Sequence, residues 1–214
     1  MNPSYVGDRP DIIGLIDGHP TRILDVGCSC GKLGRSLKEL YPDTTVWGID
    51  GDREMIAEAS TCLDHAISAD LDRVDLAEIA VGQPFDCVIA ADILEHLRDP
   101  WDLLRQIRLI LAPRGQLITS IPNVRHWSTL WSLACDGRWP CRERGIHDRT
   151  HLRFFARCNM IEMFERCGFD MVEEKRNIRL WESGGPPNSL AWLLDLPPFR
   201  PFFVFQYLHR CVSV

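Results

Sequence analysis

A predicted strand, a tight turn and a predicted helix follow one another without a break in residues 22–41. The strand at 22–26 is mostly apolar, which suits a position in the middle of a parallel sheet. Gly27 and Gly31 bracket the turn, where a backbone without Cβ atoms can bend sharply. The helix predicted over 32–41 directs its free N–H groups back at that turn. This arrangement is typical of nucleotide-cofactor sites.

The alternation of strand and helix continues as far as residue 121. Apolar residues recur at helical spacing in the longer segments, and short apolar runs separate those segments. One helix start is sharply marked, because Asp99 can cap it and Pro100 suits its first turn. The pattern predicts a parallel sheet with helices on both faces. The predicted strands are 22–26, 45–49, 65–69, 85–91 and 116–121, and the predicted helices are 10–17, 32–41, 53–62, 74–80 and 100–111.

The alternation stops in residues 122–156, which contain three tryptophans and lead into an arginine-rich run. A further helix is predicted over 157–167, and Gly168 follows it as a residue suited to the left-handed C-terminal position. Two long strands are predicted over 169–180 and 202–212, separated by a linker rich in glycine and proline. The last strand is strongly apolar, and we expect it to be covered on both faces of the sheet rather than to enter a membrane.

The composition narrows the class of protein. The chain has 214 residues, of which 45% are hydrophobic, and this is enough for one sizeable core and short for two. Its formal net charge of −6 argues against a nucleic-acid binder. No apolar run approaches the roughly 20 residues that span a bilayer. The nine cysteines form no C-x-x-C pair, which favours a reducing compartment. We expect a cytoplasmic protein without stable membrane insertion, and its oligomeric state stays open.

Five short motifs follow one another along the predicted strands and turns. The motifs are Asp25-Val-Gly-Cys-Ser-Cys-Gly31, Gly48-Ile-Asp50, Ala69-Asp70, Phe85-Asp86 and Asp92-x-Leu-Glu-His96. Over about residues 20–180 the chain resembles class I S-adenosylmethionine-dependent methyltransferases. The resemblance implies a Rossmann-like three-layer sandwich, with a seven-stranded, mostly parallel sheet, an antiparallel closing strand and helices on both faces. It further implies a single domain over 1–214, in which 122–156 forms a lid insertion on the acceptor side.

The resemblance also implies a site for S-adenosyl-L-methionine, which becomes S-adenosyl-L-homocysteine in the reaction. Asp25 resembles the carboxylate that orients the turn and the cofactor's amino group, Asp50 the one that accepts the ribose hydroxyls, and Asp70 the one that bonds the adenine amino group. Ser29 departs from the family pattern, which usually has glycine there. The spacing Gly27-x-x-x-Gly31 differs from the Gly-x-Gly-x-x-Gly of dinucleotide folds, although Asp50 alone also fits NAD. The expected cofactor-binding residues are Asp25, Gly27, Cys28, Gly31, Asp50, Gly51, Asp70, Leu71 and Ala91.

Methyl transfer needs mainly an aligned acceptor and, for a hydroxyl acceptor, a base. Candidate bases lie on loops at the carboxyl ends of the strands, and we select His96 and His151. Each of them has an alternative structural role as a buried, hydrogen-bonded histidine. The expected substrate-binding residues are Glu95, Asn123, His126, His147 and Arg149. No third ligand accompanies the Glu95-His96 pair in the sequence, and we predict no metal site.

The predicted function is transfer of a methyl group to a small-molecule or glycan-intermediate acceptor, most plausibly at oxygen. The arginines of 138–157 favour an anionic acceptor, because arginine binds carboxylate and phosphate through paired hydrogen bonds. The alternative is that these arginines pair with nearby acids or face solvent. Two other functions stay open: a non-catalytic S-adenosylmethionine- or S-adenosylhomocysteine-binding partner or sensor, and an NAD-dependent enzyme.

Overall fold

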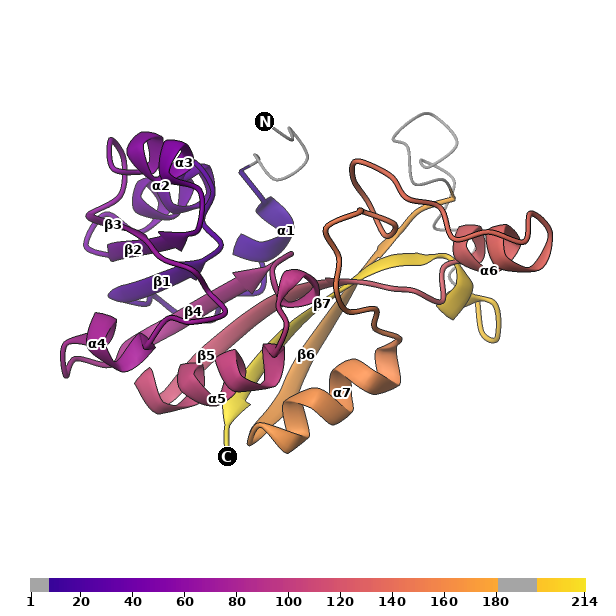
Figure 1. Cartoon of the computed structure of the whole chain (residues 1–214). Coiled ribbons are helices and arrows are strands. Elements are labelled where there is room, and N and C mark those ends of the chain that lie inside the picture. The colour runs from indigo at the N-terminus through magenta and orange to yellow at the C-terminus, as the bar shows by residue number, and fades with distance from the viewer. Residues whose placement is uncertain (1–7, 181–195) are drawn as a thin grey trace.

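The computed structural model describes residues 8–180 and 196–214. A seven-stranded sheet runs through the molecule in the order β3-β2-β1-β4-β5-β7-β6 (Figure 1). The pairs among β1 to β5 are parallel, whereas β7 runs antiparallel to both β5 and β6. The predicted architecture is therefore confirmed, including the antiparallel closing strand. The strands are β1 Arg22–Val26, β2 Thr45–Asp50, β3 His65–Ser68, β4 Phe85–Ala91, β5 Leu111–Pro122, β6 Phe169–Ile178 and β7 Val204–Ser213.

Helices cover both faces of the sheet. One buried apolar cluster packs α1, α2 and α3 against the sheet, and a second packs α4, α5 and α7 against the opposite face. The two groups lie on either side of the strands in Figure 1. This division gives the three layers expected of the fold. The α-helices are α1 Pro10–Ile13, α2 Lys32–Leu40, α3 Arg53–Ala59, α4 Leu76–Ala80, α5 Pro100–Ile110, α6 Trp127–Ala134 and α7 Arg157–Arg166, with short 3-10 helices at Leu94–His96 (η2) and Arg200–Phe202 (η4).

The central strands are buried because helices cover them on both sides. In β4 the side chains of Phe85 and of residues 87–90 are fully buried. In β7 the residues from Val204 to His209 are buried as well, which confirms that this strand is an interior strand of the sheet. Among the described residues, no helix has the length and apolar character needed to cross a bilayer.

Several predicted boundaries differ from the structure. The helix expected over 53–62 ends at Ala59, and the one expected over 74–80 begins at Leu76, where Asp75 caps it. β5 begins at Leu111 rather than at residue 116, so Leu111 is not the end of a helix. The helix α6 in the insertion was not predicted at all. Residues 181–195 of the predicted linker lie outside the described part of the chain.

Residues 122–156 leave the sheet at the end of β5 and return to it through two sets of backbone hydrogen bonds. Val124 N–H donates to the Phe155 carbonyl at 2.9 Å, which closes the base of the segment. Leu152 and Arg153 N–H both donate to the Glu95 carbonyl, at 2.8 and 3.0 Å. The second set joins the segment to η2, which follows β4. The insertion is thereby fixed beside the carboxyl edge of the sheet.

Candidate functional site

The turn after β1 is held in an unusual backbone conformation. Gly27 and Gly31 have φ values of 83° and 77°, in the left-handed region that favours glycine. A Cβ atom on Gly31 would lie 2.9 Å from the Cys62 sulfur and 3.1 Å from the Cα atom of Ala59, the last residue of α3, so this close approach also favours glycine there. Ser29, between the two glycines, has a φ of 49°. The turn therefore has positive φ at three positions, of which two are glycine and one is serine.

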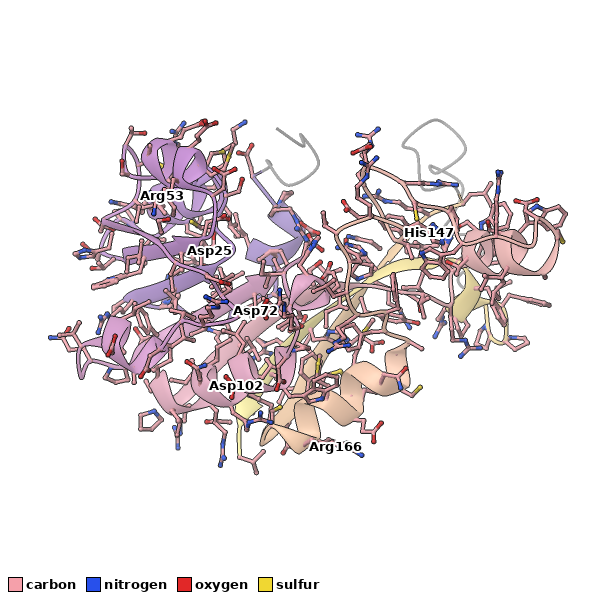
Figure 2. The ribbon with its side chains drawn as sticks, viewed as in Figure 1. Asp25, Arg53, Asp72, Asp102, His147 and Arg166 are labelled. Atoms are coloured by element: carbon pink, nitrogen blue, oxygen red, sulfur yellow. The ribbon has the colours of Figure 1, made fainter. Side chains whose placement is uncertain are left out.

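Asp50 and Asp25 flank this turn with carboxylates. Asp50, the last residue of β2, accepts hydrogen bonds from the backbone N–H of Ser29 and of Asp52, both at 2.9 Å. Asp25 lies in β1 with only 3% of its surface exposed (Figure 2). Burial, together with the nearby Asp50 carboxylate, raises the pKa of Asp25 to about 7. The two carboxylates create a negative field over the turn.

A cavity of about 580 Å³ opens beside the carboxyl ends of β2, β3 and β4. Three of the predicted cofactor-binding residues, Gly51, Asp70 and Leu71, line this cavity. The predicted base His96 lines it as well. Its volume is in the range of small-molecule sites, roughly 300–1,000 Å³. The full lining is Gly51, Arg53, Ser68, Ala69, Asp70, Leu71, Asp72, Ile93, His96 and Leu97.

Asp92, directly after β4, is the centre of a polar network that the sequence analysis missed. One carboxylate oxygen pairs with the Arg9 guanidinium, and the other accepts from Ser120 Oγ at 3.0 Å and from the Gln206 amide. Burial disfavours the charged form of Arg9, but the carboxylates of Asp92 and Asp11 outweigh burial and raise its pKa. The network ties the N-terminal segment to the carboxyl edge of β4 and β5. Because the members of the network are far apart in the sequence, no local motif predicts it.

Glu95, His96 and His151 form a compact cluster, in which each offers one ligand atom and these atoms lie within 4.8 Å of one another. Glu95 and His96 come from η2, and His151 comes from the insertion. The two imidazole rings meet edge to face, with their centres 4.6 Å apart. Glu95 is only 1% exposed. The insertion thus places His151 beside the Glu95-His96 pair, for which the sequence showed no third residue.

Hydrogen bonds define which ring nitrogens carry protons. His151 Nδ1 lies 3.1 Å from the Ile146 carbonyl, which can only accept, so Nδ1 is the donor. Thr150 Oγ1 donates to Asp148 at 2.7 Å and therefore accepts from His96 Nδ1 at 3.0 Å. In the neutral His151 ring, Nε2 then carries a lone pair. His151 therefore has the tautomer that can take up a proton at Nε2.

His151 and Glu95 approach each other without forming a hydrogen bond. The distance from His151 Nε2 to the nearer Glu95 oxygen is 3.9 Å, which is too long. Burial lowers the pKa of His151 to about 4, and the neighbouring His96 adds to the effect. Burial likewise raises the pKa of Glu95 well above its usual value, with Asp92 contributing. We do not regard the contact as an ion pair, because burial favours the neutral form of both groups. Burial also lowers the pKa of His96, so both histidines are neutral near pH 7.

Two predicted substrate-binding residues are engaged elsewhere. The side-chain amide of Asn123 donates to the carbonyls of Pro201 and Val204, at 2.9 and 2.7 Å. His126 is fully buried, with its ring nitrogens 2.8 Å from Ser128 Oγ and 2.9 Å from the Arg179 carbonyl. Both side chains hold the base of the insertion to β6 and β7. The geometry gives both of them a structural role, and their substrate-binding role stays a prediction.

The predicted acceptor-side residues His147 and Arg149 likewise have partners outside the cluster. His147 is buried beside α6, where its Nε2 lies 3.0 Å from Thr129 Oγ1 (Figure 2). Arg149 is exposed and pairs with Glu143. The other arginines of 138–157 are exposed as well, and Arg157 pairs with Glu174 at 2.6 Å. The expected anion-binding role of these arginines therefore gains no support from their positions.

The two remaining predicted cofactor-binding residues, Cys28 and Ala91, lie in the turn after β1 and at the end of β4. Cys28 is buried in the turn, and its N–H donates to the Ile49 carbonyl at 3.0 Å. Ala91 ends β4, directly before Asp92. Arg179, which no sequence pattern singled out, follows β6 at the same edge of the sheet. Its guanidinium lies 4.5 Å from the centre of the Phe205 ring.

Comparison with known proteins places this geometry in a family. A family model described as a methyltransferase domain matches residues 5–174. Trans-aconitate 2-methyltransferase of Pseudomonas aeruginosa is 32% identical over 146 residues, which cover 65% of this chain and 52% of that protein. A ubiquinone biosynthesis O-methyltransferase of Xanthomonas euvesicatoria is 30% identical over 128 residues, covering 58% and 51%. The chain spans about half the length of these curated relatives.

A solved structure supports the same fold over nearly the whole chain. The S-adenosylmethionine-dependent methyltransferase of Mesorhizobium loti matches with a TM-score of 0.62 at 20% identity, covering 95% of this chain and 96% of that one. At this identity the likeness concerns the fold alone. The family model, in contrast, spans well over half of the sequence. The chain therefore belongs to the methyltransferase-domain family.

Proposed function

We propose that this protein binds S-adenosyl-L-methionine and transfers its methyl group to a hydroxyl oxygen of a small-molecule or glycan-intermediate acceptor. The observation that carries the proposal is the arrangement at the carboxyl edge of the sheet. The left-handed turn after β1 lies against Ile93, directly before η2, and the cavity beside Asp70 is also lined by His96 of η2. His151, from the segment packed on η2, lies against His96. A cofactor bound at the turn and cavity would therefore lie near the candidate bases.

The residues present fit the cofactor. Asp25 and Asp50 flank a turn without Cβ atoms at Gly27 and Gly31, which suits a ligand with a positively charged amino group and sulfonium. Asp50 keeps lone pairs beyond its two backbone hydrogen bonds, so it can also accept ribose hydroxyls. When bound, S-adenosyl-L-methionine supplies an already activated methyl group and leaves as S-adenosyl-L-homocysteine.

The chain's own residues would position the acceptor and remove its proton. His96 lines the cavity, and in its neutral form one of its ring nitrogens can receive the proton of an acceptor hydroxyl. His151 is the second candidate base and packs directly against His96. Because both rings are neutral near pH 7, either can act as a base without first losing a proton.

An anionic acceptor remains part of the proposal, with a different arginine as its support. Arg179 lies at the carboxyl edge, half-buried over Phe205. Guanidinium groups bind carboxylates and phosphates through paired hydrogen bonds. Trans-aconitate, in the name of one relative, is itself a carboxylate. We expect Arg179→Gln to raise KM for carboxylate acceptors and to leave KM for neutral acceptors unchanged.

Turnover on a panel of acceptors tests the proposal. The panel comprises hydroxylated and unsaturated carboxylic acids, phenols and sugars, and mass spectrometry detects the methylated product. We expect turnover with at least one hydroxyl acceptor, and a loss of roughly 10²-fold or more in kcat when the base is removed by His96→Ala or His151→Ala. His65→Ala, an exposed histidine in β3, is the control. Binding of S-adenosylhomocysteine without turnover on any acceptor would contradict catalysis and favour a non-catalytic binding protein.

A further inference from the structure

Arg179 is a half-buried cation that pairs with no acid. Within the described residues its guanidinium forms no hydrogen bond and no ion pair, and it lies over the Phe205 ring, 4.5 Å from the ring centre. Removing a charged group from water without giving it a partner is unfavourable. Stacking on the ring offsets part of this penalty, but it leaves the N–H groups at the edge of the guanidinium unused.

Two carboxylates, those of Asp11 and Asp92, are close enough to act on the charge of Arg179. Burial lowers the pKa of Arg179, the two carboxylates oppose that effect, and the charge of Arg9 adds to it. Neither acid pairs with Arg179, because Arg9 binds both of them. Two arginines and two acids therefore meet at this edge of the sheet, and one of the arginines is left without a partner.

Arg9 holds the two acids through the full width of its guanidinium. Its Nε and Nη2 donate to the two oxygens of Asp11, at 3.0 and 3.1 Å, and its Nη1 donates to Asp92. Asp11 also accepts from the Asn177 amide at 3.2 Å, and Asp92 accepts from the Gln206 amide. Burial disfavours the charged form of Asp11, but the hydrogen bonds and charge of Arg9 outweigh burial and lower its pKa. Both acids are thus satisfied by other donors.

We infer that Arg179 binds a carboxylate of the acceptor and that Arg9 is the positioning residue that keeps Arg179 available for it. The inference rests on the proposed function and deepens it, because it names the substrate class. A guanidinium edge matches the two oxygens of a carboxylate. The two arginines and the two acids together carry no net charge. A carboxylate, with one negative charge, therefore suits the subsite better than a phosphate monoester, which carries roughly −1.5 to −2.

The subsite adjoins the proposed cofactor cavity. Asp92 directly precedes Ile93, which lines that cavity together with His96. The backbone of Arg179 is fixed at the same edge of the sheet, where its N–H donates to the Phe203 carbonyl at 3.0 Å. The acceptor would then be a hydroxy acid, with its carboxylate at Arg179 and its hydroxyl at the cavity.

Loss of Arg9 would affect acceptor binding through Arg179. In Arg9→Gln, Asp11 and Asp92 no longer have the cation that binds them. Arg179 is the arginine whose charge these acids already influence, and a guanidinium paired with either acid is no longer available to an acceptor. Replacing both acids as well, in Arg9→Gln/Asp11→Asn/Asp92→Asn, removes the competing carboxylates. This triple variant should therefore regain the carboxylate subsite.

Arginine modification by phenylglyoxal tests the subsite without turnover. The reagent attacks the neutral guanidine, so the lowered pKa of Arg179 favours its reaction. Peptide mass mapping follows Arg179 and, in the same sample, Arg35, an exposed arginine of α2. Butyrate is the probe, and chloride at matched ionic strength is the reference. We expect about 0.1 M butyrate to slow modification of Arg179 by about threefold or more, as for a Kd of about 50 mM or below, and to leave Arg35 unaffected.

Variants test the role of Arg9. We expect butyrate to give no protection of Arg179 in Arg9→Gln, and to protect it again in Arg9→Gln/Asp11→Asn/Asp92→Asn. Arg176→Gln, which changes an exposed arginine of β6, is the matched control and should keep the protection. With a hydroxy-acid acceptor from the turnover panel, Arg9→Gln should raise KM by about tenfold or more and change kcat by less than about twofold. The triple variant should restore KM, which a merely structural role of Arg9 would not allow.

Other outcomes overturn specific parts of this account. Butyrate that protects Arg179 no more than Arg35 would show that the subsite does not exist. Equal protection by inorganic phosphate at the same concentration would overturn the commitment to a carboxylate. Full protection in Arg9→Gln, or none in the folded triple variant, would overturn the role of Arg9. Protection of Arg179 in a wild type that does not bind S-adenosylhomocysteine overturns the proposed function and leaves the carboxylate subsite intact.

Discussion

Ser29 has a positive φ in a turn whose other positive-φ positions are occupied by glycine. Its φ of 49° lies in the region that costs most non-glycine residues roughly 1–2 kcal/mol. Its side chain makes only a weak contact, 3.6 Å from the Met55 sulfur. We predict that Ser29→Gly raises the free energy of unfolding by about 1 kcal/mol, measured by urea denaturation.

Ser60 provides the opposite control for this prediction. It ends α3 with a φ of −62°, a conformation that serine adopts without strain. Ser60→Gly is expected to lower the free energy of unfolding by about 0.5–1 kcal/mol, because glycine loses more backbone freedom on folding. Equal destabilisation by both substitutions would show that Ser29 carries no backbone strain.

The raised pKa of Asp25 predicts that ligand binding releases protons. Its pKa of about 7 means that the free protein holds a substantial fraction of the protonated acid at pH 7. A bound ligand whose ammonium group lies near Asp25 lowers that pKa, so binding releases protons. The calorimetric enthalpy of S-adenosylhomocysteine binding at pH 7 should therefore differ between phosphate and Tris buffers. The same enthalpy in both buffers, for wild type and Asp25→Asn alike, would contradict this role of Asp25.

At the scale of elements, the insertion is held mainly by side chains that bond distant backbone groups. Asn123 satisfies two carbonyls in the segment before and at the start of β7. We predict that Asn123→Ala lowers the free energy of unfolding by about 1–3 kcal/mol, because buried carbonyls lose their donors. Asn159→Ala, on the exposed first turn of α7, should cost under about 1 kcal/mol. An Asn123 variant with normal stability and a raised acceptor KM would restore the predicted substrate-binding role.

The interior strand β7 carries a buried histidine that makes stability depend on pH. Burial lowers the pKa of His209 to about 3, and Arg157 adds to the effect. Glu174 lies 4.0 Å from its Nε2 but is already paired with Arg157, and Thr119 Oγ1 bonds its Nδ1 at 3.1 Å. Because the folded pKa is below the unfolded value of about 6.5, the contribution is complete above pH 6.5 and is lost as the pH falls toward 3.

The matched comparison is His209→Gln, which removes this titration. Between pH 7 and 4.5, the wild type should lose more free energy of unfolding than the variant, by up to about 1.4 kcal/mol per pH unit below 6.5. Carboxylate titrations are common to both proteins and cancel in the difference. Parallel stability curves would show that His209 is protonated in the folded state.

Elements with strong local signals could be predicted from the sequence. The helix at Pro100 has an N-cap and a proline in its first turn, and the structure begins α5 there. α6 was missed because His126 is an unusual N-cap and serines and threonine interrupt its apolar face. The start of β5 was misplaced because its first residues, including Pro113 and Gly115, read as a helix end. Tertiary pairing with β4 outweighs the local signal there.

For the whole molecule, the sequence predicted the sheet better than it predicted the contacts of residues 122–156. The turn, Asp50 and Asp70 belong to short motifs in register with consecutive strands. The contacts of Arg9 with Asp92 and of His151 with Glu95 bridge 83 and 56 positions in the sequence. Such contacts depend on how the insertion and the N-terminal segment fold back. This is why the position of His151 beside Glu95 could not be foreseen.

The most direct test of the account is calorimetric titration of the whole chain with S-adenosylhomocysteine. We expect one equivalent to bind, with affinity reduced about 10- to 100-fold in Asp50→Asn, because a carboxylate hydrogen bond to a ligand hydroxyl is worth about 1.5–3 kcal/mol. Asp170→Asn, at an exposed carboxylate of β6, should bind like the wild type. Absence of binding to the folded wild-type protein, or unchanged affinity in Asp50→Asn, would contradict the central claim that this edge of the sheet is a cofactor site.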